Sequence, residues 1–247
     1  MTPTKGYFDV HQDDWDGIYN APRGSVRARL NRRLRRSVWG RMALALDAAR
    51  PIEGRTALDV GCGPGELSIR LAERGASRVV GIDSAVEMIN VAKARAQSRG
   101  VAERCHFMHA DFLSDALGDE RFDYTIALGV FDYQDDASAF LRRMWRHTRM
   151  RLVASFPRNV PPRSWLRRLW HGAYGSRIHY YGASRVLALG GELENARLRE
   201  HSIGGSDSTD VLVCERTDQS ASGPLGAPPA LKQWSGAELQ TLLESVW

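Results

Sequence analysis

The 247-residue chain has few of the features that are typical of secreted, zinc-binding or membrane-spanning proteins. Its three cysteines, Cys62, Cys105 and Cys214, lie far apart in sequence, which argues against a disulfide framework and against a cysteine-based zinc site. No run of 18 apolar residues occurs, so the sequence predicts no membrane span. The N-terminus also lacks the apolar stretch of a secretory signal. These absences together predict a cytoplasmic protein.

Lysine is scarce as well: 31 of the 34 basic residues are arginine, and the formal net charge is +5. Because arginine suits phosphate and carboxylate groups, an anion-binding surface is one interpretation. The codon bias of a GC-rich genome is the other. A charge excess of this size does not by itself predict a nucleic-acid partner.

What the sequence does contain is an alternation of strand and helix patterns. Strands are predicted at 56–60, 78–82, 106–110, 122–128 and 151–156, with helices at 66–74, 85–99 and 136–149 between them. Ser84 is the expected N-cap of the second helix. After an irregular stretch from 157, with a short helix near 184–189, strands near 197–203 and 210–216 suit an antiparallel hairpin at the sheet edge. The pattern predicts an α/β fold, with a doubly wound, mostly parallel seven-stranded sheet.

Three parts of the chain are expected: an N-terminal helical lid over 1–50, the α/β domain over 51–216, and a linker with a short helix over 217–247. Phe8, Trp15 and Tyr19 form an aromatic stripe at helical spacing in the first part, where a second, amphipathic helix is expected over 27–49. The last helix stops at Trp247, so we expect a further domain beyond it.

A glycine-rich turn, Gly61, Gly63 and Gly65, sits directly between the first strand and its helix. Glycine there permits positive φ and lets a ligand approach the backbone closely. Asp83 ends the second strand, 20 residues after Gly63, where a carboxylate can accept both ribose hydroxyls. Together these features predict a nucleoside-binding site at the carboxyl end of the sheet.

The charge beside the turn separates two kinds of nucleoside. Dinucleotide sites usually read G-x-G-x-x-G, whereas this turn reads G-x-G-x-G and follows Asp59. A carboxylate at Asp59 would repel a pyrophosphate, but it can accept hydrogen bonds from the ammonium group of an amino acid. The turn therefore favours a cationic nucleoside.

At this point the sequence resembles the class I S-adenosylmethionine-dependent methyltransferases. Four motifs over 56–156 carry the resemblance, in matching order and spacing: Leu58 to Gly65, Val80 to Asp83, His109 to Phe112, and Phe122-Asp123. The resemblance implies that S-adenosylmethionine is the cofactor and that 51–216 is the methyltransferase domain.

The resemblance also implies roles for single residues. The backbone of Gly61, Gly63 and Gly65 would pass under the methionine part of the cofactor, and Asp59 would lie near its ammonium group. Asp83 would hold the ribose, and Leu128 would border the methyl donor. Around the adenine, Ser84 and Met88 would flank the ring, and Asp111 and Phe112 would contact it. Asp111 could instead be a helix cap, and Phe112 could instead pack in the core.

Missing motifs exclude some classes of methyl acceptor. The chain lacks the motif of adenine-amine methyltransferases after the fourth strand, and it lacks the Pro-Cys pair of cytosine C5 methyltransferases. No metal is expected. A small or medium organic metabolite, acidic or amphipathic, with an acceptor oxygen or nitrogen remains. Asp132 and Tyr133 are the expected catalytic residues because they follow the fourth strand; Asp132 could instead be an inert turn residue. Trp15, Tyr19, Tyr180 and Tyr181 are expected to line the acceptor pocket.

Residues 151–192 show a looser likeness to the magnesium-protoporphyrin O-methyltransferases. The shared features are Ser155-Phe156-Pro157, a basic aromatic insert over 165–170, and tyrosine before the next helix. That family has a histidine after the fourth strand where this chain has Asp132, which argues against a porphyrin acceptor.

Two other functions stay open on the sequence. The arginines of 27–41, together with Arg142, Arg143, Arg146 and Arg149, could form a stripe that tracks RNA, although no RNA-binding module accompanies them. Alternatively, the chain could be a non-catalytic, cofactor-binding domain of a larger assembly.

Overall fold

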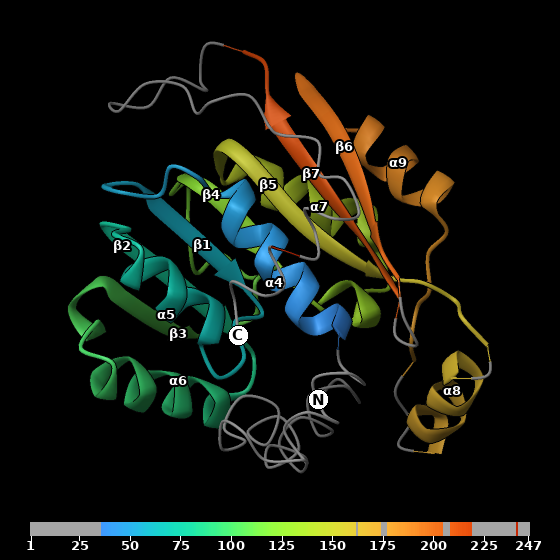
Figure 1. The fold of residues 1–247 in the computed structure, drawn as a ribbon, viewed down its shortest axis with the longest axis horizontal. Helices are drawn as coiled ribbons and strands as arrows, with labels where there is room; N and C mark the ends of the chain where they lie inside the picture. Colours follow the sequence, from blue (N-terminus) through green and yellow to red (C-terminus); the bar gives the residue numbers. More distant parts are fainter. Residues whose placement is uncertain (1–35, 162, 174–176, 205–207, 219–240, 242–247) are drawn as a thin grey trace.

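Seven strands form one sheet in the order β3-β2-β1-β4-β5-β7-β6 (Figure 1). They are β1 (Thr56–Val60), β2 (Arg78–Asp83), β3 (Cys105–His109), β4 (Phe122–Ala127), β5 (Thr148–Pro157), β6 (Ala196–Ile203) and β7 (Thr209–Arg216). The first five strands pair in parallel, and β7 pairs antiparallel with both β5 and β6. This computed structural model describes residues 36–161, 163–173, 177–204, 208–218 and 241. The topology confirms the doubly wound α/β fold with an antiparallel edge.

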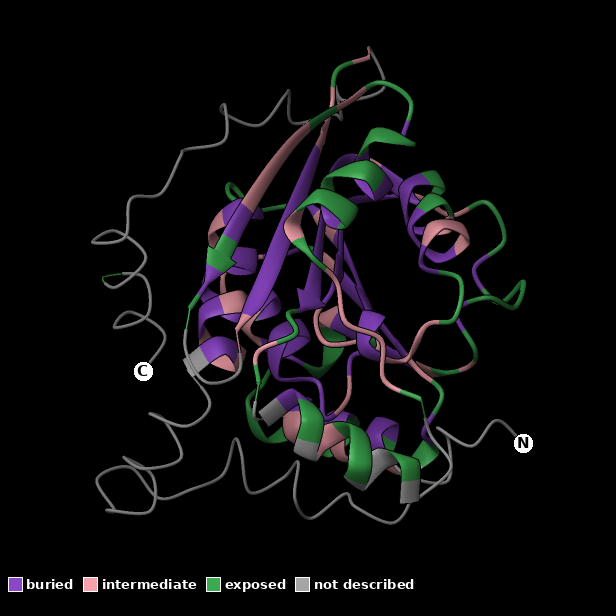
Figure 2. Ribbon diagram, turned by 90° about the vertical axis from the view of Figure 1, so that its right-hand side faces the viewer, coloured by how far each residue is buried: buried purple, intermediate pink, exposed green. Residues whose placement is uncertain are grey.

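Helices cover both faces of the sheet. On one face lie α4 (Arg36–Ala48), α5 (Glu66–Glu73) and α6 (Val86–Ser98); on the other lie α7 (Ala137–Arg146) and α9 (Ala183–Gly191). Two short 3-10 turns, η1 (Ala102–Arg104) and η2 (Phe131–Tyr133), precede β3 and follow β4. The central strands β1, β4, β5 and β7 are largely buried between the two helical layers, whereas the edge strand β6 is mostly half-buried or exposed (Figure 2). No helix within the described ranges has both the length and the apolar character that crossing a bilayer requires.

The fourth sequence motif has a structural role in the sheet. Asp123, in the fourth motif, is buried, and its Oδ2 accepts hydrogen bonds from the backbone N–H of Thr56 at 2.9 Å and from the Thr56 hydroxyl at 3.1 Å. These bonds fasten the beginning of β4 to the beginning of β1. The carboxyl ends of the same two strands therefore arrive together at the opposite edge of the sheet.

Two predicted helix ends are wrong. Ser84 is not the N-cap of α6: Ala85 takes that position, and its backbone N–H donates to Oδ1 of Asp83 at 2.9 Å. The helix expected over 136–149 ends at Arg146, because β5 already begins at Thr148. The Thr148 hydroxyl donates to the carbonyl of Met144 at 2.7 Å and so stabilises the last turn of the helix.

One helix was missed. The stretch after β5, expected to be irregular, contains α8 (Arg163–Ala173), which lies apart from the sheet at the lower right of Figure 1. Its sequence carries three arginines and no acidic residue. The Pro161-Pro162 pair just before it was the available signal, because proline is favoured at the first turn of a helix.

The expected lid range, 1–50, includes a helix of the main fold. Leu44 and Ala45 of α4 are fully buried in the core cluster, so α4 belongs to the helical layer on the sheet. Residues 1–35, with Trp15 and Tyr19, lie outside the described residues, as do 219–240 and 242–247 of the expected linker and final helix.

Candidate cofactor and acceptor site

The strand order reverses between β1 and β4, and the loops that follow these two strands touch. A Cβ placed on Gly61, after β1, would lie 2.4 Å from Cγ2 of Val130, after β4. Open α/β sheets bind their ligands at such a switch point, outside the carboxyl ends of the strands. Nearly all described residues of the predicted site lie on or beside these two loops and the neighbouring loops after β2 and β3.

The three glycines of the first loop have different reasons to be glycine. All have positive φ: +67° at Gly61, +51° at Gly63 and +78° at Gly65. A Cβ on Gly65 would lie 2.8 Å from the Cβ of Ala92, so Gly65 lets α5 pack against α6. At Gly63 no atom of the described residues other than its chain neighbours lies within 4 Å of the added Cβ. Within the described part of the chain, the backbone at Gly63 is therefore open to a ligand.

Asp83 joins the end of β2 to this loop. Its Oδ2 accepts a hydrogen bond from the backbone N–H of Gly63 at 2.8 Å, while Oδ1 accepts the bond from Ala85. Burial raises the pKa of Asp83, and the backbone N–H donors oppose that rise. Each carboxylate oxygen keeps a lone pair for a further donor.

A second carboxylate lies beneath the loop, in β1. Asp59 is buried, and its Oδ2 accepts a hydrogen bond from the Ser68 hydroxyl at 2.6 Å. Burial raises the pKa of Asp59 to about 7; the Ser68 bond opposes this rise and the Asp83 carboxylate adds to it. Two neighbouring carboxylates with raised pKa values favour a cationic ligand over an anionic one.

The residues expected around adenine divide into two groups. Met88 is buried near the start of α6, and Ser84 is exposed, with its carbonyl 3.1 Å from Nε2 of His109. By contrast, Oδ1 of Asp111 accepts a bond from the Leu113 backbone N–H at 2.9 Å, which makes Asp111 the cap of a turn.

The ring of Phe112 is buried in the core. It packs 5.0 Å from the ring of Phe140, in α7, and 5.9 Å from that of His147. For Asp111 and Phe112 the structure thus shows the plainer alternatives, a turn cap and core packing. Their contact with adenine stays a prediction.

At the end of β4, Leu128 is partly buried against the core, and Gly129 has φ +80°. The Gly129 N–H donates to the Ser155 hydroxyl at 2.8 Å. Sequence reasoning missed Arg41, which reaches Gly129 from α4: a Cβ on Gly129 would lie 2.8 Å from Nη2 of Arg41. Among the described residues no carboxylate pairs with this guanidinium. An arginine interrupting the apolar pattern of α4 was the available signal.

Asp132 is not a solvent-exposed base. It is buried in η2, and its Oδ2 forms an ion pair with Nη2 of Arg167, in α8, at 2.7 Å. The same nitrogen donates to the Tyr133 hydroxyl at 3.2 Å. Burial alone would lower the pKa of Arg167, but the Asp132 carboxylate and neighbouring tyrosines outweigh it and raise that pKa. The structure therefore brings both expected catalytic residues into contact with Arg167, which belongs to the basic aromatic insert over 165–170.

Tyr180 and Tyr181 close the same region from the segment before α9. The Tyr180 hydroxyl donates to the carbonyl of Ser164, in α8, at 3.1 Å, and the Tyr181 hydroxyl donates to the carbonyl of Phe131 at 3.2 Å. Burial raises the pKa of Tyr181 to about 12, so its hydroxyl stays protonated at neutral pH. Both tyrosines lie beside the loop that carries Asp132, where the acceptor pocket was expected.

The carboxylates beyond Asp132 have local partners. Asp136 caps α7 by accepting from the backbone N–H of Ala139 at 2.9 Å, and Oδ1 of Asp135 lies 3.0 Å from Nε2 of His179. Within the described ranges, no group of three His, Cys, Asp or Glu side chains is placed to hold a metal ion.

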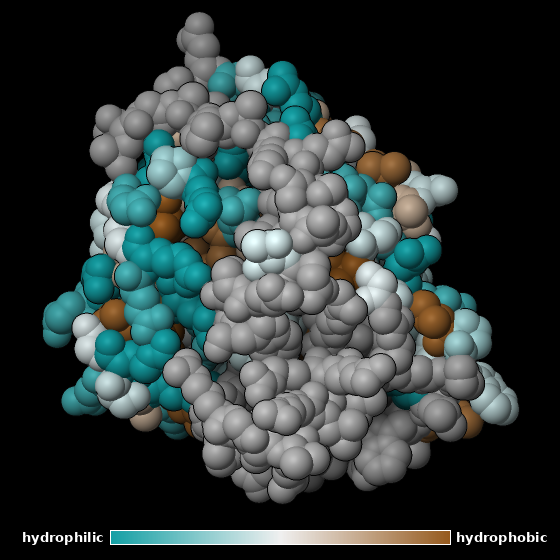
Figure 3. Space-filling view, viewed as in Figure 1, coloured by the Kyte–Doolittle hydropathy of each residue, from teal (hydrophilic) through white to brown (hydrophobic). Residues whose placement is uncertain are grey.

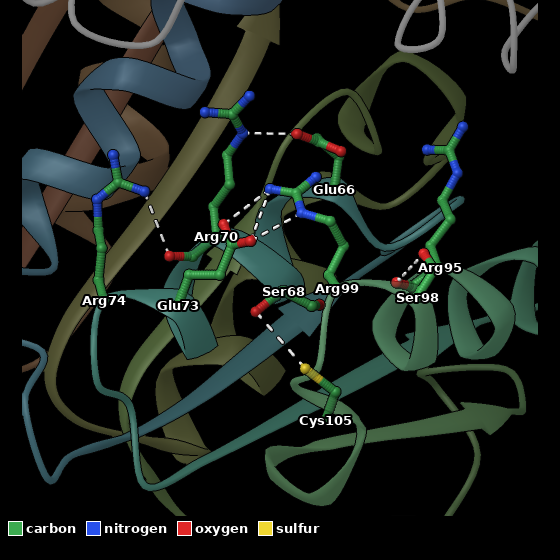
Figure 4. A network of polar contacts seen from close by, with 9 residues as sticks. All are labelled: Glu66, Ser68, Arg70, Glu73, Arg74, Arg95, Ser98, Arg99 and Cys105. Carbon is green, nitrogen blue, oxygen red and sulfur yellow. Dashed lines mark hydrogen bonds and ion pairs between the residues drawn. The ribbon is translucent and has the colours of Figure 1, made fainter.

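Arginines on the helical faces are largely paired within the chain. Over α5 and α6, Glu66 binds Arg70 at 2.6 Å and Glu73 binds Arg99 at 2.7 Å (Figure 4). Hydrophilic side chains gather on this side of the molecule (Figure 3).

The arginine stripe proposed for RNA is also broken up. Arg142 pairs with Glu192 at 2.9 Å, Arg143 binds the Ser114 carbonyl, and Arg149 lies in β5 rather than on the helix. This arrangement gives no support to a continuous RNA-tracking stripe.

Comparison with known proteins agrees with the geometry. A family described as a methyltransferase domain matches residues 57–151. The chain carries a class I S-adenosylmethionine-dependent methyltransferase domain. A magnesium protoporphyrin IX methyltransferase from Synechocystis, solved with bound S-adenosylhomocysteine (SAH), has a TM-score of 0.70 to this structure, with 23% identity over 87% of this chain and 98% of that one. At that identity the likeness shows the shared fold.

Two sequence relatives of the methyltransferase domain have a quinone in their names. A ubiquinone biosynthesis O-methyltransferase of Azorhizobium caulinodans is 44% identical over 94 residues, which are 38% of this chain and 36% of that protein. A 2-phytyl-1,4-naphtoquinone methyltransferase of Nostoc is 36% identical over 101 residues, 40% of this chain and 43% of that protein. The chain thus matches less than half of the length of these relatives. The family match ends at 151, before α8, Tyr180 and Tyr181.

Proposed function

We propose that this domain transfers a methyl group from S-adenosylmethionine to an oxygen or nitrogen atom of a small or medium organic acceptor. The observation that carries the proposal is Asp83, which binds the Gly63 backbone at the switch point of the sheet while keeping lone pairs for a ribose. Open space above Gly63 and the two carboxylates below it fit a nucleoside with a cationic amino-acid part.

The described residues offer a partner for each part of this cofactor. Asp59 would attract the ammonium group, Asp83 the ribose hydroxyls, and Ser84 and Met88 would flank the adenine. Arg41, at the end of β4, is the group we assign to the methionine carboxylate, because a guanidinium binds carboxylates in a bidentate manner. Leu128 would border the methyl group.

S-adenosylmethionine, when bound, supplies an electrophilic methyl group whose sulfur leaves as a neutral thioether. The protein then has to align the acceptor and, for some acceptors, remove one proton. We assign these tasks to Asp132 and Tyr133, with Tyr180 and Tyr181 as walls of the pocket. Trp15 and Tyr19, in a proposed N-terminal lid, would complete it. The names of the relatives make a quinol-like, amphipathic acceptor the first class to assay.

Two measurements test the proposal. Incubation with S-adenosylmethionine labelled in its methyl group and a panel of quinols and phenols should give labelled product; no product from any acceptor would count against it. Arg41→Gln should weaken SAH binding about tenfold. The same variant should bind 5′-methylthioadenosine, which lacks the amino-acid part, as the parent does. An equal loss for both ligands would contradict the role assigned to Arg41.

A further inference from the structure

The two carboxylate oxygens of Asp132 have different surroundings. Oδ2 is bound by Arg167 at 2.7 Å, whereas Oδ1 is buried and accepts no hydrogen bond within the described part of the chain. The whole residue is 5% exposed. A buried oxygen without a donor costs free energy, which a donor brought by a ligand recovers.

We propose that the acceptor presents an uncharged O–H or N–H group to Oδ1 of Asp132, and that Arg167 is the positioning residue that holds this carboxylate in place through their ion pair. An acceptor whose reacting group is a carboxylate is then rejected. The inference rests on the proposed function, because it names the acceptor class of that same site.

Charge is the physical reason for the rejection. An acceptor carboxylate next to Oδ1 would bring two like charges together in a buried place, where their repulsion is weakly screened. Arg167 does not compensate, because its Nη2 already binds Asp132 and the Tyr133 hydroxyl. A neutral hydroxyl or amine instead donates to Oδ1 and leaves the ion pair intact.

The other groups around Asp132 leave this preference unchanged. Burial raises the pKa values of Tyr180 and Tyr181, so both are neutral hydroxyls at neutral pH. The backbone N–H of His179 donates to the Asp132 carbonyl at 2.9 Å, and the His179 ring turns to the exposed carboxylate of Asp135. Arg167 is thus the described cation in direct contact with the Asp132 carboxylate.

A matched pair of ligands tests the proposal: 2-naphthol and 2-naphthoate share a ring system and differ in the donor or the charge that they present. Their binding is measured by titration at neutral pH, with the chain saturated by SAH. The parent protein should bind 2-naphthol more tightly than 2-naphthoate. Asp132→Asn should weaken 2-naphthol about tenfold and strengthen 2-naphthoate, because Arg167 loses its anionic partner.

Variants of Arg167 separate positioning from a merely structural role. Arg167→Lys keeps a cation and should retain part of the preference for 2-naphthol, whereas Arg167→Gln should lose it. Asp135→Asn is the matched control: it removes an exposed carboxylate three residues away and should leave both affinities unchanged.

The outcomes decide the proposal. Preference for 2-naphthoate in the parent, binding of neither ligand, or an unchanged ratio in Asp132→Asn would overturn it. Unchanged SAH affinity in all these variants shows that the cofactor half is intact, so failure of the acceptor inference is distinguishable from failure of the proposed function. If the parent does not bind SAH, the proposed function fails first.

Discussion

The cofactor half and the acceptor half of the site are built in different ways. In the cofactor half, most of the residues expected to bind the ligand lie in short loops directly after strands, and one hydrogen bond joins Gly63 to Asp83. In the second, side chains arrive from separate elements: Arg167 reaches Asp132 across 35 residues of sequence, and Tyr181 reaches Phe131 across 50. The sheet alone positions the first half, whereas packing of α8 and the following segment positions the second. Substitutions should therefore act on the two halves separately.

The largest expected effect tests the buried charge of the cofactor half. The pKa of Asp59 rises from 3.8 to about 7 on folding, so between these values the folded chain holds a proton that the unfolded chain has lost. Stability from this residue is present below pH 3.8 and is lost as pH rises to about 7, by up to about 4 kcal/mol. Urea unfolding across this range should show the dependence in the parent and a much flatter profile in Asp59→Asn. Parallel profiles would contradict the burial of this charge.

Next in size is removal of the carboxylate that joins β2 to the glycine loop. Asp83→Ala should weaken SAH binding by about 3 kcal/mol, the scale of two hydrogen bonds to a charged group. Asp119→Ala is the control, because the carboxylate of Asp119 is fully exposed, lies 4.0 Å from Arg146 and belongs to no part of the proposed site. Titration of both variants checks the contrast. A parental affinity in Asp83→Ala would remove the ribose assignment.

The third prediction concerns a substitution in the acceptor half, which should affect turnover and not cofactor binding. Asp132→Asn should slow turnover about a hundredfold, within the usual range for a group that handles a proton. It should leave SAH affinity unchanged, because Asp132 is bound by Arg167 and takes no part in the bond between Asp83 and Gly63. Steady-state kinetics together with titration separate the two effects. Parental turnover would reduce Asp132 to a turn residue.

The smallest effect separates two glycines of one loop. Both Gly61→Ala and Gly63→Ala place a side chain at positive φ, a strain of about 1 kcal/mol. Only the first also collides with Val130, so Gly61→Ala should be less stable than Gly63→Ala by about 2 kcal/mol. Thermal unfolding measures this difference. Equal stabilities would mean that the loops after β1 and β4 do not touch as described.

The same contrast explains what could be predicted from the sequence. Strand, glycine turn and Asp83 follow one another within 28 residues, so local pattern was enough to place them. The fold followed because each strand pattern was short, apolar and bounded by turn residues. Errors at helix ends came from hydrogen bonds that the sequence pattern does not show, such as the bond from the Ala85 N–H to Asp83 beside an N-cap that falls on Ala85 and not on Ser84.

The acceptor half was predicted as residue types but not as contacts. Asp132 and Tyr133 were predicted from their place after β4, yet the ion pair with Arg167 depends on α8. The apolar residues of 165–170 recur at helical spacing, but this stretch was expected to be irregular. Arg41 was missed because its role appears only when α4 is packed beside Gly129. For Phe112 the sequence motif pointed to adenine, and that contact stays a prediction; the structure shows its ring packed against that of Phe140.

Calorimetric titration with SAH tests the central claim most directly. The parent chain should bind SAH near micromolar, about -8 kcal/mol. Asp132→Asn should bind it equally, and Asp83→Ala should bind it much more weakly. Absence of binding to the parent, or an equal loss in both variants, would contradict a cofactor half that is complete without the acceptor half.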